Sequence, residues 1–349
     1  MLQADLDALQ AERPDVAGFA VTIDHWSHGA VSAATGQADP NGRAMTANTP
    51  VRIASITKTF VAVAALRLWE METLDLDAPI GDLISPAHDA MLTGDGYNTS
   101  AITVRHLLMH AGGLNDHFAS DVFKDMALAE PEREWTRTEQ IALMLETTDP
   151  VTAPGERFHY SDTGYLLLGE IIEATTGEPL GQAVRRLTKL DDIGLGGVWW
   201  DVFETPAADA PGRAHQWVGD IDTYHIHGSV DVYGGGGVVA SVEQTARFFS
   251  ALFRGDVFDD GETLSLMLEA PGRPAGSPYR IGLFYLERLG EQTYGHGGFW
   301  GTDVWVMPAH QITIAGATLN ATAIDDLRRL ELEVARSALT EQNEFGQND

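Results

Sequence analysis

The residues best suited to chemistry are Ser55 and Lys58, which lie in the segment Ser55–Lys58 (SITK). Three residues apart at the start of an expected helix, the two side chains share one helical face. A serine hydroxyl becomes a nucleophile only when a neighbour takes its proton or favours its loss. Burial would lower the pKa of Lys58 so that its neutral amine could take this proton. Alternatively, the charged amine would stabilise a nearby anion. The structural alternative is that Ser55 caps the helix and Lys58 is an ordinary first-turn residue.

A second candidate segment, residues 154–165, places Tyr160 and Asp162 in a turn just before another expected helix. A tyrosine beside a lysine can act as a general base in its phenolate form. The simpler interpretation is a helix-capping loop with Asp162 as the N-cap. A third segment, Tyr294–Gly301 (YGHGGFWG), combines His296 with glycines that would let a substrate lie close to the backbone of a strand.

Together these segments resemble the motifs of the serine β-lactamase-related hydrolases: class C β-lactamases, D-alanyl-D-alanine carboxypeptidases, D-amino-acid peptidases and amidases, and carboxylesterases. Residues 55–58 match S-x-x-K, residues 160–162 resemble Y-x-N, and residues 296–298 resemble the third motif of lysine or histidine, threonine or serine, and glycine. Residues 102–114 and 235–249 also resemble family segments. The resemblance implies an α/β fold of the β-lactamase/transpeptidase type, an antiparallel sheet flanked by helices with an additional all-helical subdomain.

The resemblance also implies a role for each matching residue. Ser55 would be the acylated nucleophile, and Lys58 and Tyr160 would share the proton transfers, with the identity of the base left open. The backbone N–H groups of Ser55 and Phe299 would form the oxyanion hole. His296 would stand at the edge of the site and supply positive charge or a hydrogen bond. The other expected substrate-side positions are Asp162, Gly298 and Trp300, the last being either a core residue or part of an acyl pocket.

Two positions depart from the family pattern. Asp162 stands where asparagine is usual, and its charge would hold Lys58 protonated and favour Tyr160 as the base. Gly297 lacks the hydroxyl that helps penicillin-recognising members to bind the substrate carboxylate, which argues against efficient β-lactam hydrolysis. The acidic surface also disfavours anionic substrates unless salt screens it.

We therefore expect a serine hydrolase that cleaves an amide or ester without metal or cofactor. A peptidase or amidase of small D-amino-acid or peptide substrates is the first expectation, followed by a carboxylesterase of short acyl chains and then a β-lactamase. A non-catalytic binding protein of the same fold is the alternative from another class.

Other histidines and glycines are weaker candidates for a functional site. His106 and His110 are four apart on one expected helical face, but no glutamate lies between them as in H-E-x-x-H, so a structural role is favoured over zinc. The histidines near Tyr224 are expected to line the cleft; they are His215, His225 and His227. Residues 234–237 are all glycine without the G-x-G-x-x-G spacing, which indicates backbone crowding near the cleft.

Composition narrows the classes of partner. The chain has 349 residues with 51 acidic against 22 basic side chains, a formal charge of −29 at pH 7. Such a surface repels nucleic acid and anionic lipid. Only three of the basic residues are lysines, a pattern that resembles proteins of salt-loving organisms, although an ordinary acidic protein is equally compatible. Without cysteine, disulfides and thiolate chemistry are excluded. Nothing in the composition indicates an oligomeric state.

The hydropathy pattern predicts a two-part organisation. Strands are expected at residues 18–24, 29–35, 281–287, 292–295, 302–307 and 312–319, and helices at about 55–71 and 324–339. Residues 1–75 and 230–349 would form a discontinuous α/β domain, and residues 76–229 a mainly helical subdomain.

No apolar run reaches the roughly 18 residues of a membrane span, and the first residues lack the features of a signal peptide, although a removed leader would leave export open. The polar tail 341–349 is expected to fray.

Overall fold

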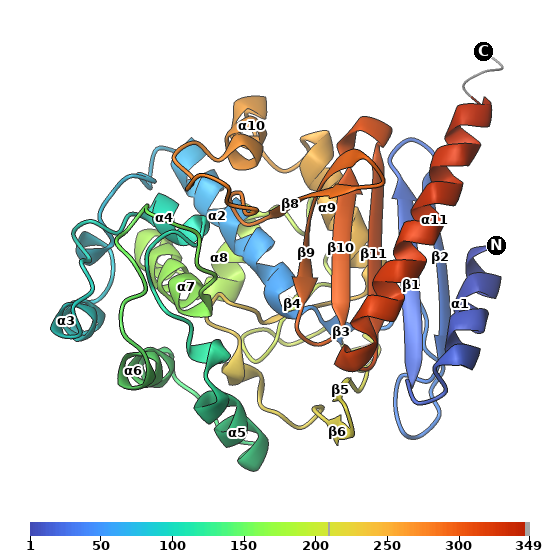
Figure 1. Cartoon of the computed structure of the whole chain (residues 1–349), viewed down its shortest axis with the longest axis horizontal. Helices are drawn as coiled ribbons and strands as arrows, with labels where there is room; N and C mark the ends of the chain where they lie inside the picture. The colour runs from blue at the N-terminus through green and yellow to red at the C-terminus, as the bar shows by residue number, and fades with distance from the viewer. Residues whose placement is uncertain (209, 346–349) are drawn as a thin grey trace.

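A six-stranded antiparallel sheet forms the centre of the computed structural model, which describes residues 1–208 and 210–345. Its strand order is β2-β1-β11-β10-β9-β8, so strands from the two ends of the chain lie side by side (Figure 1). The strands are β1 (Gly18–His25), β2 (Gly29–Gly36), β8 (Phe284–Arg288), β9 (Glu291–Gly298), β10 (Thr302–Met307) and β11 (Ile312–Thr318). The expected antiparallel sheet is confirmed.

Helices cover both faces of this sheet. Helices α1 (Leu2–Glu12) and α11 (Ile324–Phe345) pack on one face, and α9 (Val242–Arg254) contacts β1, β10 and β11 on the other. The alternation of side chains along β1 explains this, because Phe19 and Val21 join the cluster under α1 and α11 while Ala20 joins the main core.

Between the two ends of the chain, the structure is largely helical. The helices there are α2 (Thr57–Glu70), α3 (Pro86–Gly94), α4 (Val104–Leu108), α5 (Asp121–Ala129), α6 (Arg137–Thr147), α7 (Asp162–Thr176) and α8 (Leu180–Leu187), and α10 (Gly261–Glu269) follows α9. Short strands pair in two small sheets, formed by β3 (Val51–Arg52), β7 (Val238–Ala240) and β4 (Trp199–Trp200), and by β5 (Trp217–Val218) and β6 (Ile221–Asp222). Helix α2 lies between the large sheet and the helical region, and most of its residues are buried (Figure 1).

The boundaries differ from the expected ones at informative places. Strand β9 extends to Gly298, so the whole third motif lies on a sheet strand. Strand β8 begins only at Phe284, because Gly282 has a φ of 71° that extended strands do not adopt. Helix α11 continues through Phe345, and the rest of the tail expected to fray lies outside the described residues. The proposed division at residues 75/76 and 229/230 stays a prediction. Among the described helices, none is long and apolar enough to cross a bilayer.

Candidate active site

Ser55 is presented by a tight turn between the large sheet and α2. It lies in a 3-10 helix, Ala54–Ile56, which leads directly into α2. Ala54 has a left-handed φ of 48°, a conformation that non-glycine residues seldom adopt and that is typical of functional turns. The hydroxyl of Thr302 donates to the carbonyl of Ile53 at 3.1 Å and ties this turn to strand β10. The sheet therefore fixes the position of Ser55.

Lys58 is fully buried and makes three hydrogen bonds. Its Nζ donates to Ser55 Oγ at 3.1 Å, to the Gly235 carbonyl at 2.6 Å and to the Asp162 carboxylate. An ammonium has three donors, and these three acceptors satisfy all of them. Because Gly235 has no side chain, its carbonyl and the Asp162 carboxylate can both lie against the amine. The geometry is that of a charged lysine.

The electrostatics around Lys58 support its charged form. Burial opposes the charge, but Asp162, Tyr160 and Asp231 together raise the pKa of Lys58 above its ordinary value. Burial also raises the pKa of Asp231 to about 6 and that of Asp116 to about 7, with Asp162 adding to both shifts. Lys58 thus lies in a cluster of three aspartates, of which sequence reasoning found only Asp162.

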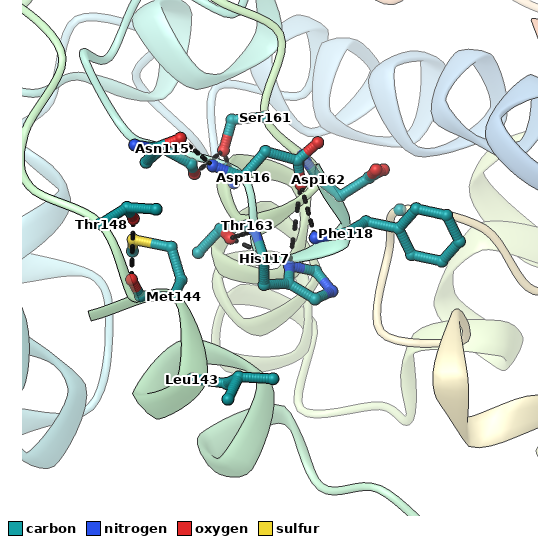
Figure 2. Close-up of polar contacts among 12 residues, drawn as sticks. Asn115, Asp116, His117, Phe118, Leu143, Met144, Thr148, Ser161, Asp162 and Thr163 are labelled. Carbon is teal, nitrogen blue, oxygen red and sulfur yellow. Dashed lines mark hydrogen bonds and ion pairs between the residues drawn. The ribbon is translucent and has the colours of Figure 1, made fainter. Parts of the chain in front are cut away.

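The loop before α5 holds Asp116 against the start of α7 (Figure 2). Asp116 Oδ1 accepts from the backbone N–H of Asp162 at 3.2 Å and from that of Phe118 at 3.0 Å. His117 is buried beside it, with Nδ1 3.0 Å from Thr163 Oγ1, and burial lowers its pKa to about 4. The N-cap of α7 is Ser161 rather than Asp162, because the Ser161 hydroxyl accepts from Gly164 N. The carboxylate of Asp162 is therefore free for Lys58.

Tyr160 lies between Lys58 and a group of aromatic rings. Its ring centroid is 5.1 Å from Lys58 Nζ and 4.1 Å from the ring centroid of His110. Burial raises the pKa of the Tyr160 phenol above its ordinary value, and the charge of Lys58 opposes this shift only in part. The three residues of the first two motifs therefore meet at one place.

His296 is a neutral hydrogen-bonding residue rather than a source of positive charge. It is buried, its Nε2 lies 3.0 Å from Tyr279 Oη, and its Nδ1 lies 2.8 Å from the Gly297 carbonyl. Since Nδ1 donates to the carbonyl, Nε2 accepts from Tyr279. Burial, then the nearby charge of Lys58, lowers the pKa of His296 to about 3. Of the two expected contributions, the geometry selects the hydrogen bond.

Two cavities meet at Ser55 and Tyr160. The larger one, about 570 Å³, runs along β9 past His296, Gly298 and Phe299 toward Arg328. The smaller one, about 280 Å³, is lined by the three aspartates, Asp116, Asp162 and Asp231, and by Lys124 and Phe118. Phe299 lines both cavities and is 42% exposed.

Gly298 packs against the Ile53 carbonyl, where a side chain would collide with the backbone, so β9 lies directly beside the Ser55 turn. Trp300 is 4% exposed and packs with Phe123 and Trp135, and it lines neither cavity. Its burial favours the first of the two alternatives given for Trp300, a core residue.

The two histidines considered as zinc ligands are arranged differently from the expectation drawn from the sequence. His106 and His110 do not share a helical face, because α4 ends at Leu108 and His110 has a left-handed φ of 53°. The Nδ1 atoms of these two histidines accept from the backbone N–H groups of Thr103 and Ser161. Within the described residues, no group of three or more His, Cys, Asp or Glu could hold a metal ion.

The histidines expected to line the cleft lie elsewhere. His215 pairs with Asp222 at 2.6 Å and stacks on Tyr224, and His227 bonds to Ser229. None of these histidines, nor His225, lines the two cavities at Ser55. The expected crowding of residues 234–237 is confirmed, because side-chain or backbone atoms of Tyr165, Asp162 and Asp231 fill the space beside these glycines.

Comparison with known proteins places this geometry in a family. The model of the Beta-lactamase family matches residues 6–336, and the chain belongs to that family. It is 31% identical over 195 residues to Esterase EstB of Burkholderia gladioli, covering 53% of this chain and 47% of that protein. The chain spans about half the length of the curated relatives it matches.

Solved structures show the same fold. The D-amino acid amidase of Ochrobactrum anthropi SV3, in complex with L-phenylalanine, superposes with a TM-score of 0.80 at 22% identity over 98% of this chain and 99% of that one. A D-stereospecific amidohydrolase of Streptomyces superposes with a TM-score of 0.75 at 23% identity, covering 92% and 94% of the two chains. The β-lactamase/transpeptidase-type fold expected from the sequence is confirmed.

Proposed function

We propose that the protein is a serine hydrolase that forms an acyl-enzyme at Ser55 and cleaves the amide bond of small D-amino-acid or peptide substrates. The observation that carries this proposal is the hydrogen bond from buried Lys58 to Ser55 Oγ, with Tyr160 beside both side chains. The fold likeness to D-amino acid amidases supports the amide, and the likeness to an esterase supports a short-chain carboxylesterase as the second candidate.

In the proposed reaction, Tyr160 rather than Lys58 takes the proton of Ser55. All three donors of Lys58 are engaged, so its Nζ has no lone pair to accept with, whereas its charge favours the phenolate form of Tyr160 against the burial that raises the pKa of this phenol. Ser55 Oγ attacks the carbonyl carbon, the proton passes to the Tyr160 phenolate, and the leaving amine then receives it as the C–N bond breaks. Water releases the acyl group by the reverse transfers.

The strand side of the site would stabilise the oxyanion. Strand β9 ends beside the Ser55 turn, which supports the backbone N–H groups of Ser55 and Phe299 as the two donors. The neutral His296 would hold the strand edge through Tyr279 and the Gly297 carbonyl.

Labelling with a fluorophosphonate probe tests the acyl-enzyme. We expect one adduct, located at Ser55 by peptide mass spectrometry and absent from Ser55→Ala. An adduct that persists in Ser55→Ala, or no adduct in the native chain, would refute the proposal. A panel of D-amino-acid p-nitroanilides, p-nitrophenyl esters and nitrocefin then separates amidase, esterase and β-lactamase activities by their values of kcat/KM.

A further inference from the structure

His110 is a buried residue with a strained backbone that takes no part in the proton transfers described above. It is 2% exposed and follows the end of α4 with a left-handed φ of 53°. A non-glycine residue keeps this conformation only where its surroundings hold it, and such residues cluster at functional sites. Ala54, in the turn that presents Ser55, shares the feature.

His110 binds the backbone on both sides of Tyr160. Its carbonyl accepts from the N–H of His159 at 2.8 Å, and its Nδ1 accepts from the N–H of Ser161 at 3.1 Å. Its ring also packs on the ring of Tyr160, with the two centroids 4.1 Å apart and the planes at 31°. One residue therefore holds Tyr160 through the preceding residue, the following residue and its own ring.

The bond to Ser161 requires His110 to be neutral. An imidazole whose Nδ1 accepts carries its single proton on Nε2. A second proton would occupy Nδ1, break the bond to Ser161 and add a cation near Lys58. Burial, followed by the charge of Lys58, lowers the pKa of His110 well below its ordinary value. His110 is thus a fixed hydrogen-bond acceptor for the backbone of Ser161.

Aromatic packing alone does not account for a histidine at this position. The rings of Tyr165 and Tyr279 also lie against His110, with centroids 5.0 and 4.6 Å away. Among the residues that the structure describes, the buried Nε2 finds no hydrogen-bond partner, and an unpaired buried donor is destabilising. An apolar ring would fill the same space without this penalty. What only the histidine supplies is the Nδ1 acceptor.

We propose that His110 is a positioning residue for proton transfer, and that its Nδ1 holds residues 159–161 so that the Tyr160 phenol stays beside Ser55 and Lys58. This inference rests on the proposed function, because Tyr160 is the base there. Misplacement of a reacting group by about 1 Å can slow a reaction by about 10²-fold, so the bond to Ser161 controls the rate without touching the substrate.

The rate constant for labelling of Ser55 by a fluorophosphonate probe tests this role in the full chain, since labelling requires the loss of the Ser55 proton. His110→Phe keeps a ring and removes the acceptor, and we expect labelling to slow by about 10- to 100-fold. His110→Asn retains an acceptor oxygen and tolerates a left-handed φ, so it should keep most of the native rate. No loss in His110→Phe, or an equal loss in both variants, would overturn the role of Nδ1.

Two further chains separate positioning from general damage. In a Tyr160→Phe background, His110→Phe should cause no additional loss of rate, because its effect passes through the phenol. A further loss of the same size would overturn the proposal. His106→Phe is the matched control: Nδ1 of His106 also accepts from a backbone N–H, that of Thr103 at 3.2 Å, but its Nε2 lies beside Gly155 rather than Tyr160. Its labelling rate should equal that of the native chain.

A second measurement does not depend on acylation. In Ser55→Ala with ¹³C-labelled tyrosine, the NMR signals of the Tyr160 ring are assigned by their loss in Tyr160→Phe. We expect one sharp set of these signals in the parent and in His110→Asn, and a broadened or doubled set in His110→Phe. The other tyrosines show whether each variant is folded, and His110→Ala replaces His110→Phe if the latter is not. If the native chain forms no adduct at Ser55, the proposed function fails, and a single sharp Tyr160 set in every variant separately overturns the positioning role.

Discussion

The two walls beside Ser55 differ in how they handle charge. The helix-side wall (Lys58, Asp116, Asp162 and Asp231) buries four ionisable groups that interact electrostatically with one another. The strand-side wall (residues 296–299, at the end of β9) presents a neutral histidine, two glycines and Phe299, and the charged residues that line its cavity lie at the far end, at Arg288, Asp303 and Arg328. The helix-side wall is thus built for proton transfer, and the strand-side wall for holding a substrate.

Removing the cation from the helix-side wall should have the largest effect. We expect Lys58→Ala to lower kcat/KM by at least about 10³-fold, because Tyr160 loses the charge that stabilises its phenolate. The buried aspartates then lose the charge of Lys58, so the free energy of unfolding should fall by about 3–5 kcal/mol. Steady-state kinetics and urea unfolding measure both.

Lys124→Ala is the control for this loss of charge. Lys124 lines the same smaller cavity, but its side chain is 38% exposed and its ion pair with Asp121 spans 3.7 Å. This variant should keep activity and stability close to those of the native chain. Native-like turnover in Lys58→Ala would remove the assigned function of the helix-side wall.

Adding a cation to the strand-side wall tests the opposite half of the comparison. His296→Lys restores the residue of the family motif, but it places a second ammonium in a buried site next to Lys58. We expect the free energy of unfolding to fall by about 3 kcal/mol. Gln292→Lys, on an exposed position of the same strand, should leave it unchanged. A stable and fully active His296→Lys would show that this wall tolerates charge.

The helix-side wall should also make stability depend on pH. Because the folded-state pKa of Asp116 is raised from 3.8 to about 7, the folded chain binds more protons than the unfolded chain between these values. Stability contributed by the protonated carboxyl is therefore lost as pH rises from about 4 to 7. We expect Asp116→Asn to gain at least about 1 kcal/mol over the native chain between pH 5 and 8. A constant difference between the two unfolding curves would contradict the raised pKa.

The residues that belong to sequence motifs were predictable, and those that join them only through tertiary packing were not. The motifs at residues 55–58, 160–162 and 296–298 give the right elements because each lies at a helix start or on a strand. Asp116, Asp231 and Tyr279 come from segments whose sequence indicates loops, and only tertiary packing brings them to Lys58 and His296.

The charge state of His296 could not be predicted from the sequence either. Residue type alone leaves a histidine free to be charged or neutral, and complete burial beside Lys58 decides the question. The position of Arg328 could not be predicted for a related reason. The missing side chain at Gly297 is visible in the sequence, but the side chain that occupies this space belongs to a residue 31 positions further on.

The smallest expected effect separates two glycines of β9. At Gly297 an added Cβ would lie 2.7 Å from the flexible end of Arg328 and 3.1 Å from Asp303 Oδ1, whereas at Gly295 it meets backbone, with Trp305 Cα at 2.7 Å. Gly297→Ala should therefore change the free energy of unfolding by no more than about 0.5 kcal/mol, while Gly295→Ala should cost about 1–3 kcal/mol. Urea unfolding of the two single variants measures this difference, and an equal loss of stability in both would contradict the yielding of Arg328 beside Gly297.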